Sequence, residues 1–236
     1  MQAVVLAGGK GTRLAPYTNI LPKPLMPIGN MPILEVLLRQ MKSAGIDEVI
    51  ITVGHLAGLL EAFFKDGHQL GLKIRYSFEE TPLGTAGPLA LVGGLQETFM
   101  VCNGDVLTTL NCNDLLKFHR EKKGIATIAM HHRQVSINLG VIECNDMHEI
   151  TDYLEKPSMD YMVSMGIYIF EPTVLNFIQP NIYLDFPDLV LRLISAGEKV
   201  FGYQFDGYWQ DLGNPDDYQQ AQQDFASMQS QFIMDN

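Results

Sequence analysis

The sequence has little positive charge. Its 236 residues include 16 Lys and Arg against 27 Asp and Glu, a formal net charge of −11 at pH 7. Nucleic acids and anionic membranes bind proteins through basic surfaces. The deficit of Lys and Arg therefore predicts that neither nucleic acid nor a membrane is a partner of this chain.

Cysteine and long hydrophobic runs are also scarce. Cys102, Cys112 and Cys144 are odd in number and lack paired metal-ligand spacing, which predicts free thiols in a reducing compartment. No apolar run approaches the roughly 20 residues of a membrane span, and the N-terminus has no basic region or small-residue cleavage site. These absences predict a cytoplasmic protein.

The glycine-rich segment near the N-terminus lacks the marks of the two commonest phosphate loops. No Gly-Lys-Ser or Gly-Lys-Thr follows it, and Leu14 stands where a Gly-x-Gly-x-x-Gly fingerprint needs its third glycine. The sequence thus argues against a Walker-type NTPase and against a dinucleotide-dependent oxidoreductase.

What the segment does contain predicts a phosphate cradle. It follows the apolar run Ala3–Leu6, and its glycines leave backbone N–H groups uncovered, while Arg13 and Lys23 add fixed positive charge. A solvated glycine loop is the alternative that the glycines alone leave open. The residues assigned to the cradle are Leu6, Ala7, Gly8, Gly9, Gly11, Thr12 and Arg13.

Apolar runs alternate with helical patterns along the first half of the chain. Strands are expected at 3–6, 49–53, 73–78 and 99–102, and helices at 32–44, 56–65, 85–91 and 113–122. Further strands crowd together at 125–130, 139–142, 149–154 and 165–170. This order predicts a Rossmann-like α/β fold with a mostly parallel or mixed sheet, helices on both faces and ligands at the carboxyl ends of the strands.

The organisation is that of a single domain, 1–236, in two halves. We expect a nucleotide-binding half at about 1–123 and a second half at about 124–218, whose strands form the other wall of a cleft. A Gln-rich tail, 219–236, is expected to start as a helix and fray toward its end.

An ordered set of motifs resembles the sugar-phosphate nucleotidyltransferases, also called nucleotide-sugar pyrophosphorylases, over nearly the whole chain. The motifs are Gly8-Gly9-Lys10-Gly11-Thr12-Arg13, Lys23-Pro24-Leu25, Glu80-Thr81-Pro82-Leu83-Gly84-Thr85-Ala86-Gly87, Asn103-Gly104-Asp105, Glu155-Lys156-Pro157, Gly166-Ile167-Tyr168 and Trp209-Gln210-Asp211-Leu212-Gly213. The resemblance implies a single nucleotidyltransferase domain that joins an NTP to a sugar 1-phosphate and releases pyrophosphate.

The resemblance also implies roles for individual residues. Asp105 and Asp211 would hold Mg²⁺, while Arg13 and Lys23 would grip the triphosphate and Lys156 the sugar phosphate. Arg13, Lys23, Asp105 and Lys156 form the implied catalytic set. The implied nucleotide-binding residues are those of the cradle together with Glu80, Pro82, Gly84, Thr85 and Asp105. The implied sugar-phosphate-binding residues are Asn103, Gly140, Glu155, Lys156 and Ser164.

Without the resemblance, several of these residues have simpler readings. Asp105 and Asp211 could be turn or loop carboxylates, and Glu155-Lys156 an exposed ion pair. His131 and His132 lie next to each other on an expected strand, so their side chains point to opposite faces and cannot readily share a metal. Trp209, Tyr203 and Tyr208 are expected to pack together.

The substrates are less firmly indicated than the reaction. Residues 79–89 are most similar to mannose-1-phosphate guanylyltransferases, which favours GTP, whereas thymidylyl and uridylyl relatives share the cradle. Leu139, Ser164 and the stretch 184–188 depart from patterns common in relatives, which leaves the sugar open. A non-catalytic regulatory subunit of such an enzyme is the alternative from another class, and a homo-oligomer is possible.

Overall fold

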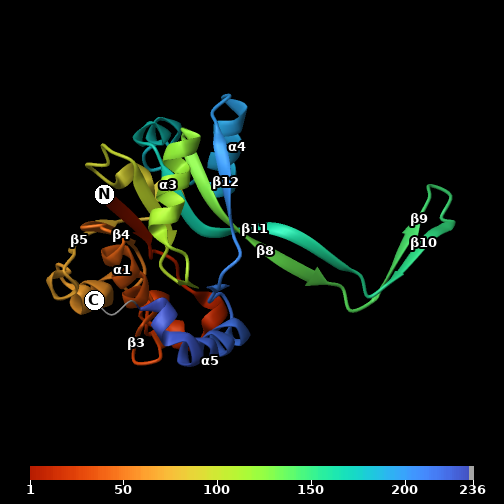
Figure 1. The fold of residues 1–236 in the computed structure, drawn as a ribbon, viewed down its shortest axis with the longest axis horizontal. Coiled ribbons are helices and arrows are strands. Elements are labelled where there is room, and N and C mark those ends of the chain that lie inside the picture. Colours follow the sequence, from red (N-terminus) through yellow and green to blue (C-terminus); the bar gives the residue numbers. More distant parts are fainter. Residues whose placement is uncertain (234–236) are drawn as a thin grey trace.

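The computed structural model describes residues 1–233, and its centre is a seven-stranded sheet (Figure 1). The strand order is β12-β8-β11-β6-β1-β4-β5, and β11 alone in this sheet runs antiparallel to both of its neighbours. The strands are β1 (Gln2–Leu6), β4 (Glu48–Val53), β5 (Lys73–Phe78), β6 (Phe99–Asn103), β8 (Ala126–Ser136), β11 (Ser158–Phe170) and β12 (Val200–Phe205). The mostly parallel sheet predicted from the sequence is confirmed.

Three short strand pairs lie outside this sheet. They are β2 (Pro27–Ile28) with β3 (Met31–Pro32), β7 (Val106–Thr108) with β13 (Trp209–Asp211), and β9 (Gly140–Cys144) with β10 (Ile150–Glu155). All three pairs are antiparallel. The second pair brings Asp211 beside Val106, next to the turn that follows β6.

Helices cover both faces of the sheet, as predicted. α1 (Ile33–Ser43), α2 (Ala57–Phe64) and α3 (Cys112–Lys122) pack on one face, and α4 (Phe186–Ser195) packs on the other. α5 (Pro215–Phe232) packs outside α1, so the start of the Gln-rich tail is helical, while its last residues, 234–236, lie outside the described part. The 3-10 turns are Thr12–Leu14, Tyr17–Asn19, Lys23–Leu25, His68–Leu70, Gly87–Leu91 and Pro172–Phe177.

Helix α1 shows how the sequence produces this packing. Leu34, Leu37, Leu38 and Met41 recur with helical spacing, and all four side chains are buried against the sheet. The helix ends where Gly45 takes a left-handed conformation with φ 79°, which glycine adopts without strain. The predicted helix at 32–44 is therefore confirmed to within a residue at each end.

Two segments differ from their expected form. The predicted helix at 85–91 is a 3-10 turn, Gly87–Leu91, with Pro88 in its first turn. The strands β8 and β11 extend far beyond their predicted bounds, because both continue past the sheet as a two-stranded ribbon.

This ribbon and the β9–β10 hairpin at its end form a projecting arm, residues 132–163 (Figure 1). The sequence predicts that these strands form the second wall of a cleft, and the structure differs. The ribbon leaves the sheet because β12 stops pairing with β8 at His131 and β6 pairs with β11 only from Ile167 onward. The arm stands apart from the body of the molecule.

The cysteines are free, as expected. Cys102 and Cys112 are buried and Cys144 is exposed. Burial raises the pKa of the Cys102 thiol well above its ordinary value and that of Cys112 to about 11. Both buried thiols are therefore protonated at neutral pH and pack as small apolar groups.

Within residues 1–233, no helix is both long enough and apolar enough to span a membrane.

Candidate active site at the carboxyl edge of the sheet

A cavity of about 860 Å³ opens at the carboxyl ends of β1, β4, β5 and β6. β1 lies between β4 and β6, and the later strands are added first on the β4 side of β1 and then on the β6 side. Open α/β sheets bind ligands at such a switch point. The lining residues are Leu6 to Arg13, Lys23, Pro24, Thr52, Gly54, His55, Glu79 to Thr85, Pro88, Asn103, Asp105, Tyr183 and Asp185.

The glycine-rich loop after β1 is shaped by two glycines with different requirements. Gly11 has φ 62°, and its carbonyl oxygen accepts hydrogen bonds from Thr18 Oγ1 at 2.8 Å and from Leu14 N at 2.9 Å. At Gly8 a Cβ atom would lie 1.8 Å from Glu79 Oε1, whereas at Gly9 it would meet nothing within 4 Å. Gly8 thus leaves room for the Glu79 side chain to lie against the loop after β1.

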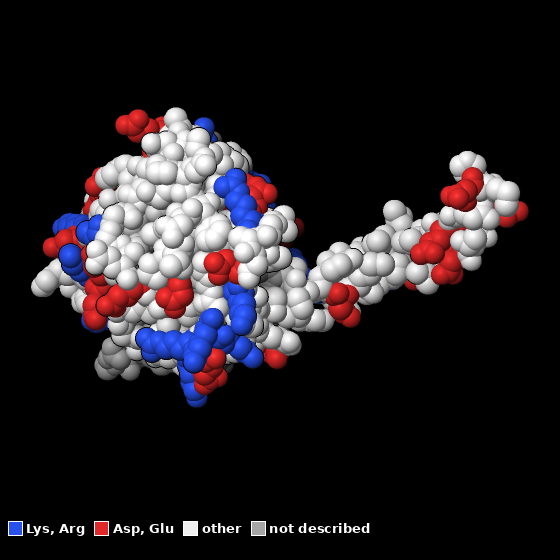
Figure 2. All heavy atoms as spheres, turned by 90° about the horizontal axis from the view of Figure 1, so that it is seen from above, with Lys and Arg blue, Asp and Glu red and all other residues white. Residues whose placement is uncertain are grey.

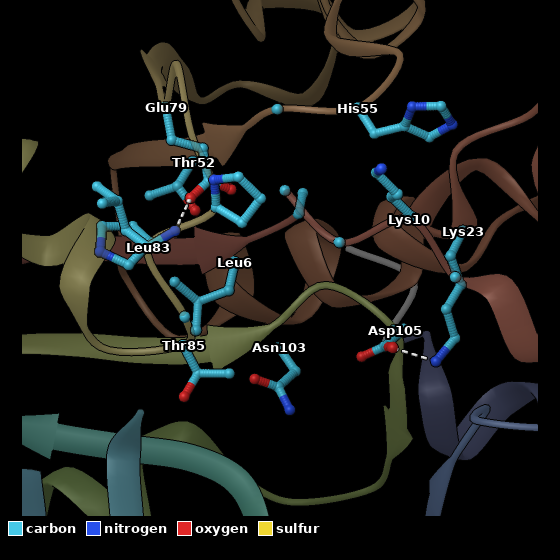
Figure 3. A pocket seen from close by; sticks show the side chains of 18 of the residues that line it. Leu6, Lys10, Lys23, Thr52, His55, Glu79, Leu83, Thr85, Asn103 and Asp105 are labelled. Carbon is cyan, nitrogen blue, oxygen red and sulfur yellow. Dashed lines mark hydrogen bonds and ion pairs between the residues drawn. The ribbon is translucent and has the colours of Figure 1, made fainter. Parts of the chain in front are cut away.

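Positive charge gathers at one side of the cavity. Figure 3 shows Lys10, Lys23 and His55 together there, with Glu79, Leu83 and Thr85 on the opposite side. Lys23 is 8% exposed and forms an ion pair with Asp105, and its Nζ lies 3.7 Å from Asp211 Oδ1. The arrangement gives the cavity a polyanion-binding end.

The turn that carries Asp105 is held at both sides by backbone hydrogen bonds. Gly104 N donates to Leu6 O at 2.9 Å, and Leu212 N donates to Asp105 O at 3.3 Å. The first bond ties the turn to β1 and the second ties it to the loop after Asp211. The chain therefore positions the two carboxylates on one side of the cradle.

The two carboxylates influence each other electrostatically. Burial raises the pKa of Asp211 and the charge of Asp105 raises it further, while Lys23 and Arg13 oppose the shift. The position of Arg13 fits this, since a Cβ atom at Gly213 would lie 3.1 Å from Asp211 Oδ2 and 3.2 Å from Arg13 Nη2. Arg13, Lys23, Asp105 and Asp211 thus form one charged cluster.

The cluster fits a magnesium ion that is bound together with a phosphate ligand. Residues 1–233 contain no group of three or more His, Cys, Asp or Glu side chains arranged to hold a metal. Mg²⁺ is usually held by one or two carboxylates, with substrate phosphates and water completing its octahedron. Asp105 and Asp211 satisfy that smaller requirement.

The opposite side of the cavity is built by a contact between residues 83–87 and 183–186. Thr85 donates to Asp185 Oδ1 from its backbone N at 2.9 Å and from its Oγ1 at 3.1 Å. Phe186 N donates to Thr85 Oγ1 at 2.9 Å, and Tyr183 OH donates to Asp185 Oδ2 at 2.7 Å. Burial raises the pKa of Asp185, but these bonds from Tyr183 and Thr85 outweigh burial and lower it.

Gly84 lies in this contact and must be glycine. Its φ is 80°, and a Cβ atom there would lie 2.6 Å from Leu184 O. Just after β5, Glu79 Oε2 accepts a hydrogen bond from Leu83 N at 3.1 Å. The backbone of residues 83–85 is therefore fixed from two directions.

Asn103 marks where the cavity meets the base of the arm. It ends β6, and its side chain lies over Gly166, where a Cβ atom would be 2.5 Å from Asn103 Nδ2. Ser164 is close by on β11, with its Oγ 3.2 Å from Tyr168 OH. Ser164 is near this edge but does not line the cavity.

The structure brings together most of the predicted site residues. Every residue predicted to bind nucleotide lines the cavity, and so do Lys23 and Asn103. Asp211 joins through the charged cluster. Gly140, Glu155 and Lys156 lie on the exposed arm, away from the cavity, with Lys156 between β10 and β11.

Sequence reasoning did not assign Lys10, Thr52, Gly54, His55, Tyr183 or Asp185 to the site. Thr52 lies near the end of β4, and Gly54 and His55 follow that strand. The alternation of strands and helices places this end at the same sheet edge, so the signal was present. Tyr183 and Asp185 come from the turn before α4, about 100 residues from Thr85 along the chain. No periodicity in the sequence pairs these two segments.

The three aromatic residues expected to pack together do not form one cluster, because Tyr203 packs on Phe118 and Tyr208 packs on Phe232 in a separate cluster. Trp209 Nε1 donates to Met165 O at 3.0 Å, and the ring centroids of Trp209 and His131 are 5.5 Å apart. His131 Nδ1 contacts Phe205 O at 2.9 Å, whereas His132 Nε2 lies 3.3 Å from Asp160 Oδ1. The two imidazoles thus have different partners.

Two curated relatives are similar over nearly all of this chain. UTP–glucose-1-phosphate uridylyltransferase of Synechocystis sp. is 36% identical over 94% of the chain, and mannose-1-phosphate guanylyltransferase of Mycobacterium tuberculosis is 37% identical over 96%. The chain spans 62% and 65% of the length of these two relatives.

Solved structures share the fold. A UDP-glucose pyrophosphorylase complexed with UDP-glucose matches with a TM-score of 0.73 at 20% identity, covering 96% of this chain and 98% of that one. HddC from Yersinia pseudotuberculosis matches with a TM-score of 0.71 at 22% identity, covering 95% and 99%. The family described as nucleotidyl transferase matches residues 2–228. With its cradle, charged cluster and sheet edge in place, this chain belongs to the nucleotidyl transferase family.

Proposed function

We propose that this protein transfers a nucleotidyl group from an NTP to a sugar 1-phosphate, giving a nucleoside diphosphate sugar and pyrophosphate. The observation that carries the proposal is the charged cluster of Arg13, Lys23, Asp105 and Asp211 beside the glycine loop after β1. Such a cluster suits a triphosphate because it combines backbone N–H groups, fixed cations and carboxylates that share a metal.

The reaction needs positioning more than covalent chemistry. A phosphate oxygen of the sugar 1-phosphate attacks the α-phosphorus of the NTP, a new P–O bond forms, and the bond to the β-phosphate breaks as pyrophosphate leaves. Both reactants are polyanions, so their repulsion must be offset where they meet. Lys10 and Lys23 supply positive charge on one side of the cavity (Figure 3), and Arg13, which also lines it, adds charge beside Asp211.

A magnesium ion held by Asp105 and Asp211 would neutralise phosphate charge and orient the phosphates when bound. The chain's own part is to hold both carboxylates near Lys23. The Lys23 ammonium group then contacts the carboxylates before substrate binds and can contact a phosphate group once substrate is bound. Asp211, whose pKa is raised by burial and by Asp105, would be ionised more readily as cations approach it.

For the base, we propose that the protein prefers GTP. Guanine presents N–H donors along its amide edge, and Glu79, on the side of the cavity opposite the cations, and Glu80 both line the cavity. Because Glu79 already accepts from Leu83 N, we assign the guanine contact to Glu80. Mannose 1-phosphate or a related hexose is the proposed acceptor substrate.

Uridylyl or thymidylyl transfer to glucose 1-phosphate is the second candidate. It is favoured by the similarity to the Synechocystis uridylyltransferase, which is as close as the similarity to the guanylyltransferase. The two candidates share the cradle and the charged cluster, and differ only in the contacts of the base and the sugar.

The test is a matrix of initial rates. Pyrophosphate release is measured for GTP, UTP, dTTP, CTP and ATP, each with mannose 1-phosphate and glucose 1-phosphate, at saturating Mg²⁺. We expect kcat/KM for GTP to exceed that for the other bases by about tenfold or more, because a wrong base leaves buried polar groups unpaired. A preference for UTP or dTTP replaces the first candidate by the second.

Absence of turnover with all ten pairs, together with NTP binding in calorimetry, would instead indicate a regulatory subunit. The presence of Arg13, Lys23, Asp105 and Asp211 in one cluster argues against that outcome, since a subunit without activity does not need them. The roles of Gly140, Glu155, Lys156 and Ser164 toward the sugar phosphate are part of the same proposal.

A further inference from the structure

The cavity turn at residues 83–87 is held by residues 183–186, about 100 positions further along the chain. Leu184 makes three backbone hydrogen bonds to that turn, at 2.9, 2.9 and 3.0 Å. The side chains of Thr85 and Asp185 add further bonds between the two segments. We refer to the contact of residues 83–87 with residues 183–186 as the latch.

The carboxylate of Asp185 does not serve its own helix. Asp185 is the N-cap residue of α4, and an Asp at that position ordinarily accepts a hydrogen bond from an N–H group in the first turn. It makes no such bond, and its Oδ1 instead accepts from Thr85 N at 2.9 Å and from Thr85 Oγ1 at 3.1 Å. Thr85 Oγ1 in turn accepts from Phe186 N, the first N–H of α4, at 2.9 Å. Thr85 thus caps the helix, and the Asp185 carboxylate holds Thr85.

The Asp185 carboxylate is both ionised and fixed in place. Burial acts to raise its pKa, but the bonds from Tyr183 and Thr85 lower the pKa below its ordinary value, so the group is charged at neutral pH. Hydrogen bonds to a charged acceptor are roughly twice as strong as those between neutral groups. The next residue, Phe186, is 3% exposed, and its ring centroid lies 4.2 Å from that of Tyr168. Asp185 therefore holds Thr85 from a rigid point of the core.

The latch leaves one backbone donor of the turn for a ligand. Within residues 1–233, the N–H groups of Leu83, Thr85, Ala86 and Gly87 all donate to protein acceptors, whereas that of Gly84 makes no such bond. Gly84 lines the cavity, and its φ of 80° is a conformation that glycine adopts without strain. Backbone polar groups need a partner, so this N–H is available to a bound molecule.

We propose that Asp185 is a positioning residue for the nucleotide: through Thr85 it fixes the turn, and with it the Gly84 N–H, in the geometry that binds the base. The inference rests on the proposed function, which assigns this turn to the base of an NTP. Lys10 and Lys23, which would bind the phosphates, lie on the opposite side of the cavity from Thr85 (Figure 3). Asp185 therefore sets the affinity for the NTP and leaves the rate of the phosphate chemistry unchanged.

Three variants separate this role from a loss of charge. Asp185→Ala removes the bonds from Thr85 and Tyr183, so the turn must be ordered when a nucleotide binds. Asp185→Asn keeps an oxygen atom that can accept both bonds from Thr85. Asp188→Ala is the matched control, because it removes the same charge at an exposed position in the first turn of α4 that does not line the cavity.

Calorimetry of the full chain with GTP and Mg²⁺ measures the effect on binding. Ordering the backbone of even one residue weakens binding by roughly tenfold, so we expect the Kd for GTP to rise by about tenfold or more in Asp185→Ala. It should rise by less than about threefold in Asp185→Asn and stay unchanged in Asp188→Ala. Thermal unfolding checks that all three variants fold. Unchanged GTP binding in Asp185→Ala, or equal weakening in Asp188→Ala, overturns the proposal.

Steady-state kinetics and hydrogen exchange distinguish positioning from general damage. In Asp185→Ala, the KM for GTP should rise by about tenfold, while kcat and the KM for mannose 1-phosphate stay within about threefold, because the charged cluster is intact. Amide protons of residues 83–87 should exchange faster in the free Asp185→Ala chain and at wild-type rates in Asp188→Ala. A lower kcat with an unchanged KM for GTP, or unchanged exchange of the turn, overturns the proposal.

A double-mutant cycle tests whether Asp185 acts through Thr85. Thr85→Val removes the hydroxyl group at an exposed position and keeps the shape of the side chain. Alone it should raise the Kd for GTP about fivefold, and the double variant should stay within about twofold of Asp185→Ala, because both changes break the same contact. Losses that multiply, to about fiftyfold, would mean that Asp185 touches the ligand itself and overturn the positioning role. If Asp185→Ala does not fold, unchanged GTP binding in Thr85→Val overturns the proposal.

The same titrations separate this inference from the proposed function. If the wild type binds UTP more tightly than GTP and Asp185→Ala weakens UTP by about tenfold, the proposed base is wrong and the positioning role stands. If the wild type binds NTP but releases no pyrophosphate, the transferase is refuted, and the calorimetric comparison of Asp185→Ala with Asp188→Ala still decides the role of Asp185. If neither GTP nor UTP binds the wild type, the inference fails together with the proposed function.

Discussion

Among single residues, Lys23 is unusual because its charged ammonium group is buried, next to two carboxylates. It is 8% exposed, pairs with Asp105 and lies 3.7 Å from Asp211. A buried charge is tolerated only when it is paired, and removing its partner leaves an uncompensated ion. The cluster is therefore held together by the same charges that would bind a phosphate and a metal.

Replacement of Asp105 separates its chemical role from its structural one. Asp105→Asn should lower kcat at saturating Mg²⁺ by about 100-fold or more, because an electrostatic group at the reacting phosphates is lost. The chain should still fold but melt at a lower temperature, because Lys23 loses its nearer partner and keeps only Asp211 at 3.7 Å. Asp216→Asn, an exposed change in the first turn of α5, is the control and should retain wild-type turnover. Near wild-type kcat in Asp105→Asn contradicts the metal assignment.

Asp211 yields a prediction about stability and pH. Its pKa is raised above the ordinary 3.8, first by burial and then by Asp105, so the folded state binds its proton more tightly than the unfolded chain does. The ionised carboxylate therefore lowers stability at neutral pH. Asp211→Asn should raise the melting temperature at pH 7, and the gain should shrink as the pH falls toward 3.8.

Thermal unfolding of wild type and variant across that pH range measures the effect. Asp216→Asn again serves as control and should lower the melting temperature slightly at pH 7, because an acidic residue in the first turn stabilises a helix. If Asp211→Asn is less stable than wild type at neutral pH, the carboxylate is needed for folding and the reasoning fails.

At the scale of elements, the glycine loop offers a matched pair of substitutions. Gly8→Ala places a Cβ atom 1.8 Å from Glu79 Oε1, so the Glu79 side chain must move and its bond to Leu83 N is strained or lost. We expect a loss of about 1–3 kcal/mol in the free energy of unfolding. Gly9→Ala meets nothing within 4 Å and should be neutral or slightly stabilising.

Chemical denaturation of the two variants decides between them, because they differ by one position in the same loop. Equal stability would mean that the Glu79 side chain can move away from a methyl group at position 8 without cost. The comparison requires no substrate, so it tests the loop's construction independently of the proposed activity.

The elements predicted from the sequence are those whose signals are local. β1, β4, β5 and β6 are buried apolar runs, and α1 has a clear helical period with a glycine at its end, so their bounds were predicted within one or two residues. The cradle followed from the same logic, since a glycine loop after a buried strand lies at the sheet edge. The family resemblance then implied that Asp105 and Asp211 bind the same metal ion.

What the sequence could not reveal depends on long-range packing. Whether β8 and β11 end at the sheet or continue as a ribbon depends on where β12 and β6 stop pairing, and no residue of the ribbon signals this. Thr85 and Asp185 meet across 100 residues of chain. Glu155-Lys156 has the right motif for a sugar-phosphate site, but its position is set by the arm.

On the scale of the whole molecule, the chain consists of a packed body and an arm with few ties to it. The body has three clusters of buried side chains. No residue of the arm, 132–163, belongs to any of the three. Figure 2 shows the arm as a thin extension with acidic groups along it. Stability of the body should therefore be independent of the arm.

Removal of the arm tests this division. Gln134 and Asp160 lie opposite each other on the ribbon, so residues 135–159 can be replaced by Asn-Gly, the dipeptide preferred in two-residue hairpin turns. The shortened chain should unfold within a few degrees of the wild-type melting temperature, because no buried cluster is lost. In calorimetry it should bind GTP as tightly as the wild type, since every predicted nucleotide residue remains. It should release no pyrophosphate with any sugar 1-phosphate, because Lys156 and its neighbours are gone. A shortened chain that fails to fold would make the arm part of the core, and one that keeps wild-type turnover would remove Gly140, Glu155 and Lys156 from the active site.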